Sequence, residues 1–73
     1  MVLITFLKPN LIIHSDKLMT GSIKVFDMQK HILWSLKLVH KNFVSIKAKP
    51  DWPDKIEIEL YDEDKLIKKE LMI

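Results

Sequence analysis

Apolar and polar residues alternate along most of this chain, in short runs separated by turn-forming residues. A period of two places successive side chains on opposite faces of an extended strand, so these runs predict β-strands. The strongest run is residues 32–39, in which Ile32, Trp34, Leu36 and Leu38 share one face. The predicted strands are residues 2–7, 11–14, 23–27, 32–39, 43–49, 55–61 and 66–73. In residues 43–49 the expected inward side chains are Val44, Ile46 and Ala48, and in residues 55–61 they are Ile56, Ile58 and Leu60.

The segments between the runs carry residues that end strands. Turns are predicted at residues 9–10, 15–17, 28–30 and 40–42, and a hairpin tip at residues 62–64. The clearest loop is residues 50–53, because Pro50 and Pro53 lack the backbone donor that a central strand needs.

The last segment has two interpretations. Asp62 could cap a helix whose apolar stripe is Leu66, Ile67 and Leu71. The short, hairpin-like spacing after residues 55–61 favours a returning strand, which is the prediction adopted.

Six to seven short strands within 73 residues predict one all-β domain spanning residues 1–73. The expected architecture is a small antiparallel β-sandwich, a reduced version of an immunoglobulin-like sandwich. The alternative is a five- or six-stranded small barrel, with or without a C-terminal helix.

Composition supports a folded domain. Apolar residues make up 48% of the chain, which is enough for a core and argues against disorder. Cysteine is absent, so we expect neither disulfides nor a thiolate metal site, and a cytoplasmic location in the cell or an infected host. The apolar residues 1–7 lack a basic leader and stop at Lys8-Pro9, so we expect a strand and no membrane segment.

Candidate catalytic and metal-binding patterns are weak. The adjacent residues His14, Ser15 and Asp16 have the types of a hydrolase triad, but neighbours in a strand point to opposite sides. Glu57 and Glu59 share one strand face, where carboxylates are usually solvated. No enzymatic activity is therefore expected.

Metal and cofactor patterns are equally poor. The three histidines, residues 14, 31 and 40, do not have the spacing of local metal ligands. The acidic residues 62–64 lack the spaced ligands and the glycine of a calcium loop. A single glycine, Gly21, leaves no glycine-rich phosphate loop. We expect no metal and no cofactor.

Charge is distributed unevenly. All twelve basic residues are lysine. Residues 1–49 carry eight lysines and two aspartates, a net charge of +6, whereas residues 50–73 carry four lysines and eight acids, a net charge of −4. The sequence therefore predicts a basic region and an acidic hairpin.

Two kinds of surface follow from these patterns. Apolar side chains on the face opposite Trp34, and a tryptophan held between prolines, predict a protein-binding or self-association surface. Its candidate residues are Trp52, Phe43, Phe26, Leu33 and Val39. Packing over the end of the barrel is the other role considered for Trp52. The last strand, which finishes in Leu71, predicts an open edge for another chain.

The alternative surface is a lysine and aromatic sheet face that binds single-stranded nucleic acid. Its candidate residues are Lys24, Lys37, Lys47 and Lys49. The absence of arginine weakens this interpretation, because arginine is the preferred side chain for bidentate contacts with phosphates and bases. The leading expectation is a non-catalytic accessory or inhibitory domain of the type found in phages and mobile elements, acting by binding a protein partner.

Overall fold

The computed structural model describes residues 1–72, and these form five antiparallel strands and no helix. The strands are β1 (Val2–Leu7), β2 (Asn10–Phe26), β3 (Ile32–Lys47), β4 (Ile56–Asp62) and β5 (Lys65–Met72). The all-β prediction is confirmed, including a strand rather than a helix over the last segment. The predicted number of six to seven strands is wrong, because two pairs of predicted strands are each one long strand.

The long strands β2 and β3 bend where turns were predicted. Their pairing shifts near the bend, since β2 advances from His14 to Met19 while β3 passes only from Phe43 to Lys41. His40 takes a positive φ of 48°, and its backbone N–H donates to Thr20 Oγ1 at 3.2 Å. Extra residues on one strand of a pair bend it and increase its twist. The predicted turns at residues 15–17 and 40–42 are therefore bends within two continuous strands.

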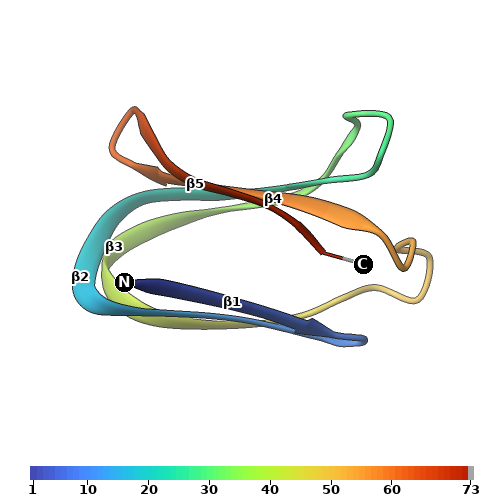
Figure 1. The fold of residues 1–73 in the computed structure, drawn as a ribbon, viewed down its shortest axis with the longest axis horizontal. Helices are drawn as coiled ribbons and strands as arrows, with labels where there is room; N and C mark the ends of the chain where they lie inside the picture. Colours follow the sequence, from blue (N-terminus) through green and yellow to red (C-terminus); the bar gives the residue numbers. More distant parts are fainter. Residues whose placement is uncertain (73) are drawn as a thin grey trace.

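The bend converts one sheet into a half-barrel (Figure 1). The first half of β2 pairs with β1, the second half pairs with β4, and β3 follows the other edge of β2 through both halves. We call β1 and the adjoining halves of β2 and β3 the β1 arm (residues 2–15 and 41–47). The β4–β5 arm is residues 21–38 and 56–72. A single curled sheet thus replaces the predicted two-sheet sandwich and is nearer to the small-barrel alternative.

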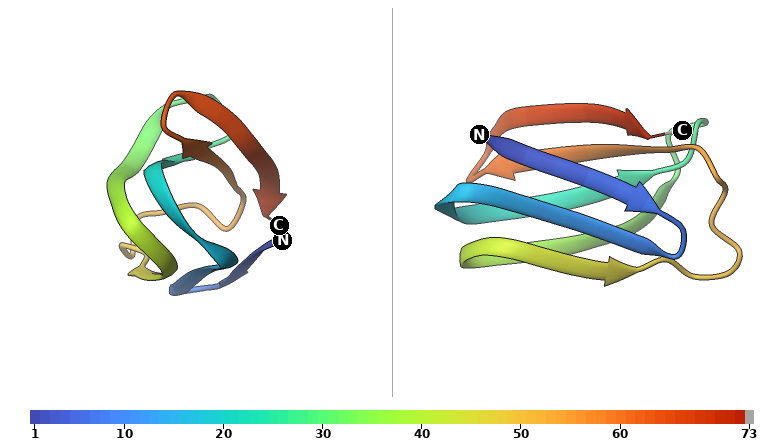
Figure 2. Two further views of the ribbon diagram at one scale, coloured as in Figure 1. Left: turned by 90° about the vertical axis from the view of Figure 1, so that its left-hand side faces the viewer. Right: turned by 60° about the horizontal axis from the view of Figure 1, so that its bottom comes forward.

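The core fills the space between the two arms, which face one another in the end-on view of Figure 2. Leu11 and Ile13 contribute from the β1 arm, and Ile23, Ile58 and Leu60 from the β4–β5 arm, all fully buried. Val44 and Ile46 of β3 are buried as expected, and so is Ala48, which directly follows the strand.

Trp52 packs against this core from the loop between β3 and β4, with only 3% of its surface exposed. Its loop is attached to the β1–β2 turn, because Ala48 N–H donates to Pro9 O at 2.6 Å and Lys8 Nζ donates to Trp52 O. Of the two roles considered for Trp52, packing at the end of the half-barrel is therefore the observed one.

Gly21 lies where β2 passes close to the backbone of the β4–β5 hairpin. Its neighbour Thr20 accepts a hydrogen bond from Glu63 N–H at 2.8 Å. A Cβ atom at position 21 would overlap the carbonyl oxygen of Tyr61 and lie 2.8 Å from the backbone nitrogen of Glu63. The only glycine of the chain is thus required by a backbone-to-backbone contact.

Asp27 organises the turn between β2 and β3. Its Oδ1 accepts hydrogen bonds from the backbone N–H groups of Gln29 and His31, both at 2.9 Å. These donors lower the pKa of Asp27, with the His31 N–H as the largest cause. The turn predicted at residues 28–30 is therefore confirmed, and a carboxylate holds it.

Candidate interaction surface

The outer face of the β1 arm carries an unusual number of apolar side chains. The strand register aligns three rows across β1, β2 and β3 on this face. The rows are Leu3–His14–Phe43, Thr5–Ile12–Ser45 and Leu7–Asn10–Lys47. We call these nine residues the apolar face.

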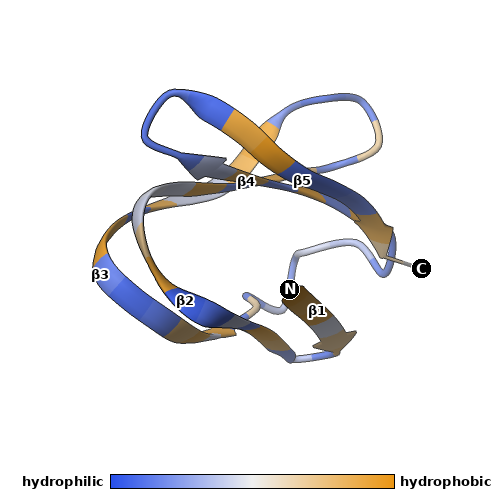
Figure 3. Cartoon of the chain, turned by 60° about the vertical axis from the view of Figure 1, so that its left-hand side comes forward, coloured by the Kyte–Doolittle hydropathy of each residue, from blue (hydrophilic) through white to orange (hydrophobic). Residues whose placement is uncertain are grey.

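The apolar side chains of the apolar face are well exposed. Leu3 is 57% exposed, Leu7 77% and Phe43 54%, while Ile12 is half-buried between them. β1 is orange along most of its length when the chain is coloured by hydropathy (Figure 3). A contiguous apolar area on a sheet surface is typical of a binding site, whereas scattered single residues are not.

β1 supplies apolar side chains to both of its faces. Its exposure alternates along the strand, with Val2, Ile4 and Phe6 partly buried against the core and Leu3 and Leu7 outward. Only Thr5 of the six residues is polar, so the core alone does not account for the composition of this strand.

His14 and Phe43 contact each other in the first row. Their ring centroids are 6.3 Å apart with an interplanar angle of 61°, an edge-to-face arrangement. Leu3 pairs with His14 on the other side of β2. The row therefore forms a short apolar and aromatic ridge across three strands.

The charges on the two arms differ. Residues 1–17 and 41–49, which build the β1 arm and its connections, carry five lysines and one aspartate, a side-chain net charge of +4. The single acid, Asp16, is paired with the N-terminal ammonium at 2.7 Å. All other residues together carry seven lysines and nine acids, a net charge of −2. The apolar face thus lies on the basic part of the molecule.

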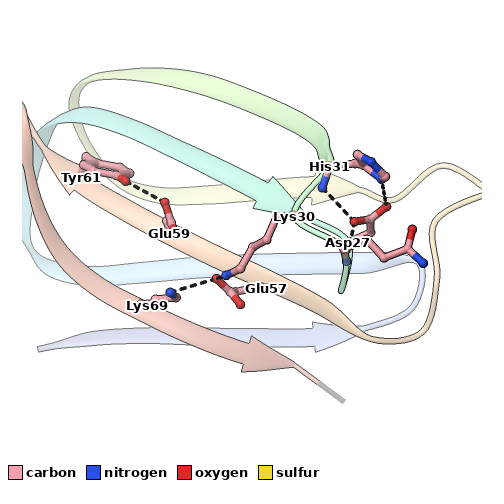
Figure 4. A network of polar contacts seen from close by, with 8 residues as sticks. Asp27, Lys30, His31, Glu57, Glu59, Tyr61 and Lys69 are labelled. Carbon is pink, nitrogen blue, oxygen red and sulfur yellow. Dashed lines mark hydrogen bonds and ion pairs between the residues drawn. The ribbon is translucent and has the colours of Figure 1, made fainter.

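The outer face of the β4–β5 arm carries a network of paired charges (Figure 4). This arm also has exposed apolar side chains, among them Ile32, Leu66 and Leu71. Glu57 accepts from Lys30 Nζ and lies 3.3 Å from Lys69 Nζ, and its side chain is only 13% exposed. These two ammonium groups, Lys30 first, lower the pKa of Glu57. The expectation that Glu57 is merely solvated is therefore wrong.

Glu59 and Tyr61 complete this network. Tyr61 O–H donates to Glu59 Oε1 at 2.7 Å, and this bond raises the pKa of Tyr61. Lys24 Nζ lies 4.9 Å from the centre of the Tyr61 ring, at cation–π distance. Polar groups on this arm therefore bind one another.

The predicted protein-binding residues separate into two groups. Phe43 lies on the apolar face, and Val39 is 60% exposed near the bend of β3. Trp52 is buried, so it is not an accessible anchor. Leu33 packs against the core, and Phe26 is half-buried. The prediction that Leu33 lies opposite Trp34 is wrong.

A β-bulge explains the position of Leu33. Val25 pairs with Trp34 but Phe26 pairs with Ile32, so Leu33 is the extra residue of β3. A bulge re-aims the side chains beside it. The alternation of side chains that was predicted for residues 32–39 is therefore interrupted at Leu33. Ile32, which was predicted on the same face as Trp34, is 61% exposed.

The predicted nucleic-acid-binding lysines do not form one patch. Lys24 and Lys37 lie on the β4–β5 arm, Lys47 lies on the apolar face, and Lys49 lies in the loop after β3. Lys37, Lys47 and Lys49 are exposed, whereas Lys24 is half-buried beside Tyr61. The bend of β3 places Lys37 on one arm and Lys47 on the other.

The candidate catalytic triad does not converge. Ser15 is 3% exposed and its Oγ accepts the Lys17 N–H at 3.1 Å, whereas His14 and Asp16 are exposed. The three residues lie within β2, not in the predicted turn. Within residues 1–72, no three histidine or acidic side chains gather as a metal site would require.

A hollow of about 610 Å³ lies between the β2–β3 turn and the loop after β3, lined by Leu33, Pro53 and three aspartates among others. Two of these carboxylates already have partners in the fold. Asp27 holds its own turn, and Asp54 lies 3.4 Å from Lys8 Nζ. The hollow is also lined by Asp51 and Lys55, which are exposed and belong to none of the ion pairs of residues 1–72.

Strand edges are also open in the described part of the chain. β3 pairs only with β2, β1 only with β2, and β5 only with β4. Between β1 and β5, Lys68 Nζ donates to Val2 O at 3.0 Å. An open edge can accept a strand from another chain. Residues 1–72 contain no helix that is long and apolar enough to cross a membrane.

Seven of the nine residues of the apolar face were not identified as binding residues from the sequence. They include all three of its aliphatic residues, which are Leu3, Leu7 and Ile12. The available signal was the run of residues 2–7, which is apolar on both faces of a strand. Comparison of the chain with protein-family models, with curated proteins and with solved structures finds no match.

Proposed function

We propose that the protein is a non-catalytic interaction domain that binds another protein chain through its apolar face. The observation that carries this proposal is the exposure of Leu3, Leu7 and Phe43 on one sheet surface. Covering apolar surface releases about 25 cal/mol for each Å² removed from water, so a partner there gains affinity from these side chains.

The β1 arm suits a binding role because the residues of its apolar face form no ion pairs within residues 1–72, unlike those on the outer face of the β4–β5 arm. On the latter arm, Lys30, Glu57 and Lys69 form ion pairs, and Tyr61 is bonded to Glu59. Aromatic side chains are prominent among the residues that contribute most to protein interfaces, and Phe43 is the largest exposed apolar side chain of this face, so it is expected to contribute most.

Protein is favoured over single-stranded nucleic acid by the composition of the face. Leu3, Leu7 and Ile12 are aliphatic, and Phe43 is the only phenylalanine, tyrosine or tryptophan among its nine residues. Nucleic-acid-binding sheets use several rings on which successive bases stack. The Phe43 ring also already has an aromatic neighbour, the His14 ring.

The proposal is tested by selecting binders from a random-sequence peptide library against the immobilised domain. Each recovered peptide is then measured against the wild type and against Phe43→Ser. Binding that is lost by at least about tenfold in the variant supports the proposal. A library that returns no binders, or only peptides that bind both proteins equally, contradicts it.

Self-association is a specific form of the same proposal, and the open edges of β3 and β5 offer a second route to it. Sedimentation equilibrium over a range of protein concentrations measures it. A dimer that Phe43→Ser dissociates uses the apolar face, whereas a dimer that the variant leaves intact uses an edge.

A further inference from the structure

The apolar face is basic as well as apolar, and this combination defines the chemistry of its partner. We propose that the face binds an acidic protein segment, in which apolar side chains are flanked by aspartate or glutamate. This inference rests on the proposed function and adds the charge of the partner to it.

The position of the lysines relative to the apolar residues is the first argument. Lys47 lies in the row of Leu7 and Asn10, and Lys41 lies two positions before Phe43 on β3. Both lysines are exposed, and neither is among the ion pairs of residues 1–72. Cations at the rim of an apolar centre favour a partner with the opposite arrangement of charge.

The absence of compensating acids on this arm is the second argument. The only acid in residues 1–17 and 41–49 is Asp16, which is already paired. Of the five lysines in these two ranges, only Lys8 has an ion-pair partner within residues 1–72, namely Asp54 in the loop after β3. On the other arm, Glu57 is paired with both Lys30 and Lys69. The excess of positive charge in residues 1–17 and 41–49 therefore attracts anions.

An acidic protein fits the apolar face better than a nucleic acid, the other polyanion that its positive charge would attract. A nucleic acid presents regularly spaced phosphates and flat bases, which the single phenylalanine and the peripheral lysines match poorly. An acidic protein segment presents aliphatic side chains, which pack against Leu3, Leu7 and Ile12. The observations therefore favour the protein segment.

The test uses three probes with the isotope-labelled full chain. Two synthetic peptides have the same leucine and phenylalanine positions, and the intervening positions are glutamate in one and lysine in the other. The third probe is oligothymidylate. Amide chemical shifts are followed residue by residue during each titration, at low and at physiological salt.

The glutamate peptide is expected to bind at least about tenfold more tightly than the lysine peptide. It should shift the amides of Leu3, His14 and Phe43, and it should weaken with salt. The double variant Lys41→Glu/Lys47→Glu should reverse the preference between the peptides. Lys37→Glu, on the β4–β5 arm, is the matched control and should leave the preference unchanged.

Three results overturn the inference. They are equal or tighter binding of the lysine peptide, no binding of the glutamate peptide, and tighter binding of oligothymidylate to the same residues. Library peptides that depend on Phe43 but carry no acidic residues would also overturn it while leaving the proposed function standing. Failure of the two proposals is thereby distinguishable.

Discussion

The ring of His14 lies 6.3 Å from the ring of Phe43, edge to face, on the outer surface of the β1 arm. The two residues are brought together by the register of β2 and β3, and β1 adds Leu3 to the same row. Three strands thus build a surface ridge from residues that are far apart in the sequence.

Residues of this ridge should contribute little to folding. Phe43→Ser should change the free energy of unfolding by less than about 1 kcal/mol, because more than half of the side chain is already exposed. Val44→Ala, at the neighbouring buried position, should cost about 2 kcal/mol. Urea unfolding of both variants measures the difference, and a larger loss for Phe43→Ser would assign that ring to the core.

Trp52 should behave as a core residue despite its place in a proline-flanked loop. Trp52→Ala should reduce the free energy of unfolding by about 3 to 5 kcal/mol, because the ring is 3% exposed and packs at the end of the half-barrel. Asp51→Ala, at the exposed neighbouring position, should be close to neutral. A folded and stable Trp52→Ala variant would show that the ring is dispensable for the core.

Gly21→Ala should be strongly destabilising, by about 3 kcal/mol, because the added methyl group overlaps the backbone of Tyr61. The backbone cannot yield without opening the contact between Thr20 and Glu63. Ser22→Ala, one position further on the same strand, should cost less than about 0.5 kcal/mol. Thermal unfolding compares them, and similar melting temperatures would rule out the close approach.

Glu63 has a φ of 54° at the tip of the β4–β5 hairpin, a conformation that costs a side chain about 1 kcal/mol. Glu63→Gly should therefore stabilise the protein by a few tenths to about 1 kcal/mol. Asp64→Gly is the matched control, since its φ is not positive, and it should not stabilise. Chemical denaturation measures the free energy of unfolding of both variants. Equal effects of Glu63→Gly and Asp64→Gly would contradict a strained backbone at Glu63.

Stability should fall at both extremes of pH. The pKa values of Asp27 and Glu57 are lowered by their donors, so their contribution is complete above about pH 5 and is lost as the pH falls through the folded pKa values. Glu57 raises the pKa of Lys30, and Glu59 raises the pKa of Tyr61. The contribution of these two groups to the free energy of unfolding is therefore complete below about pH 9 and is lost as the pH rises through their folded pKa values.

The urea midpoint measured across the pH range tests this expectation. The midpoint should be constant at intermediate pH and should fall at both low and high pH. Glu57→Gln should weaken the fall of the midpoint at low pH, and the part of the fall that comes from Asp27 should remain. A midpoint that keeps rising below about pH 4 would contradict the sign of the shifts.

The sequence predicted the class of fold because alternation survives in β4 and in most of β2 and β3. Ile56, Ile58 and Leu60 on β4 and Val44 and Ile46 on β3 were all placed on the correct face. The hairpin tip at residues 62–64 and the loop at residues 50–53 were also predicted from their turn residues.

The bends could not be predicted from local sequence. Polar residues at 15–17 and 40–42 are compatible with a turn or with a curved strand, and only long-range pairing with β1 and β4 decides between them. The extra residue at Leu33 arises from the same pairing, which shifts between Val25 and Phe26. For this reason the number of strands was overestimated.

The candidate surface was only partly predictable. Phe43 and Lys47 were identified from their alternation, but Leu3 and Leu7 were not, because a strand that is apolar on both faces is also typical of a fully buried strand. Their exposure depends on β1 lying at an edge of the half-barrel with nothing over its outer face in residues 1–72.

The most direct test of the central claim compares two double variants in the same peptide-binding measurement. Leu3→Ser/Phe43→Ser removes the ridge of the apolar face, and Ile32→Ser/Leu71→Ser removes two comparably exposed apolar side chains from the β4–β5 arm. We expect the first variant to lose at least about tenfold in affinity for the selected peptides, and the second variant to keep the wild-type affinity. Equal losses in both variants, or a loss only in the second, would contradict the assignment of the apolar face as the binding site.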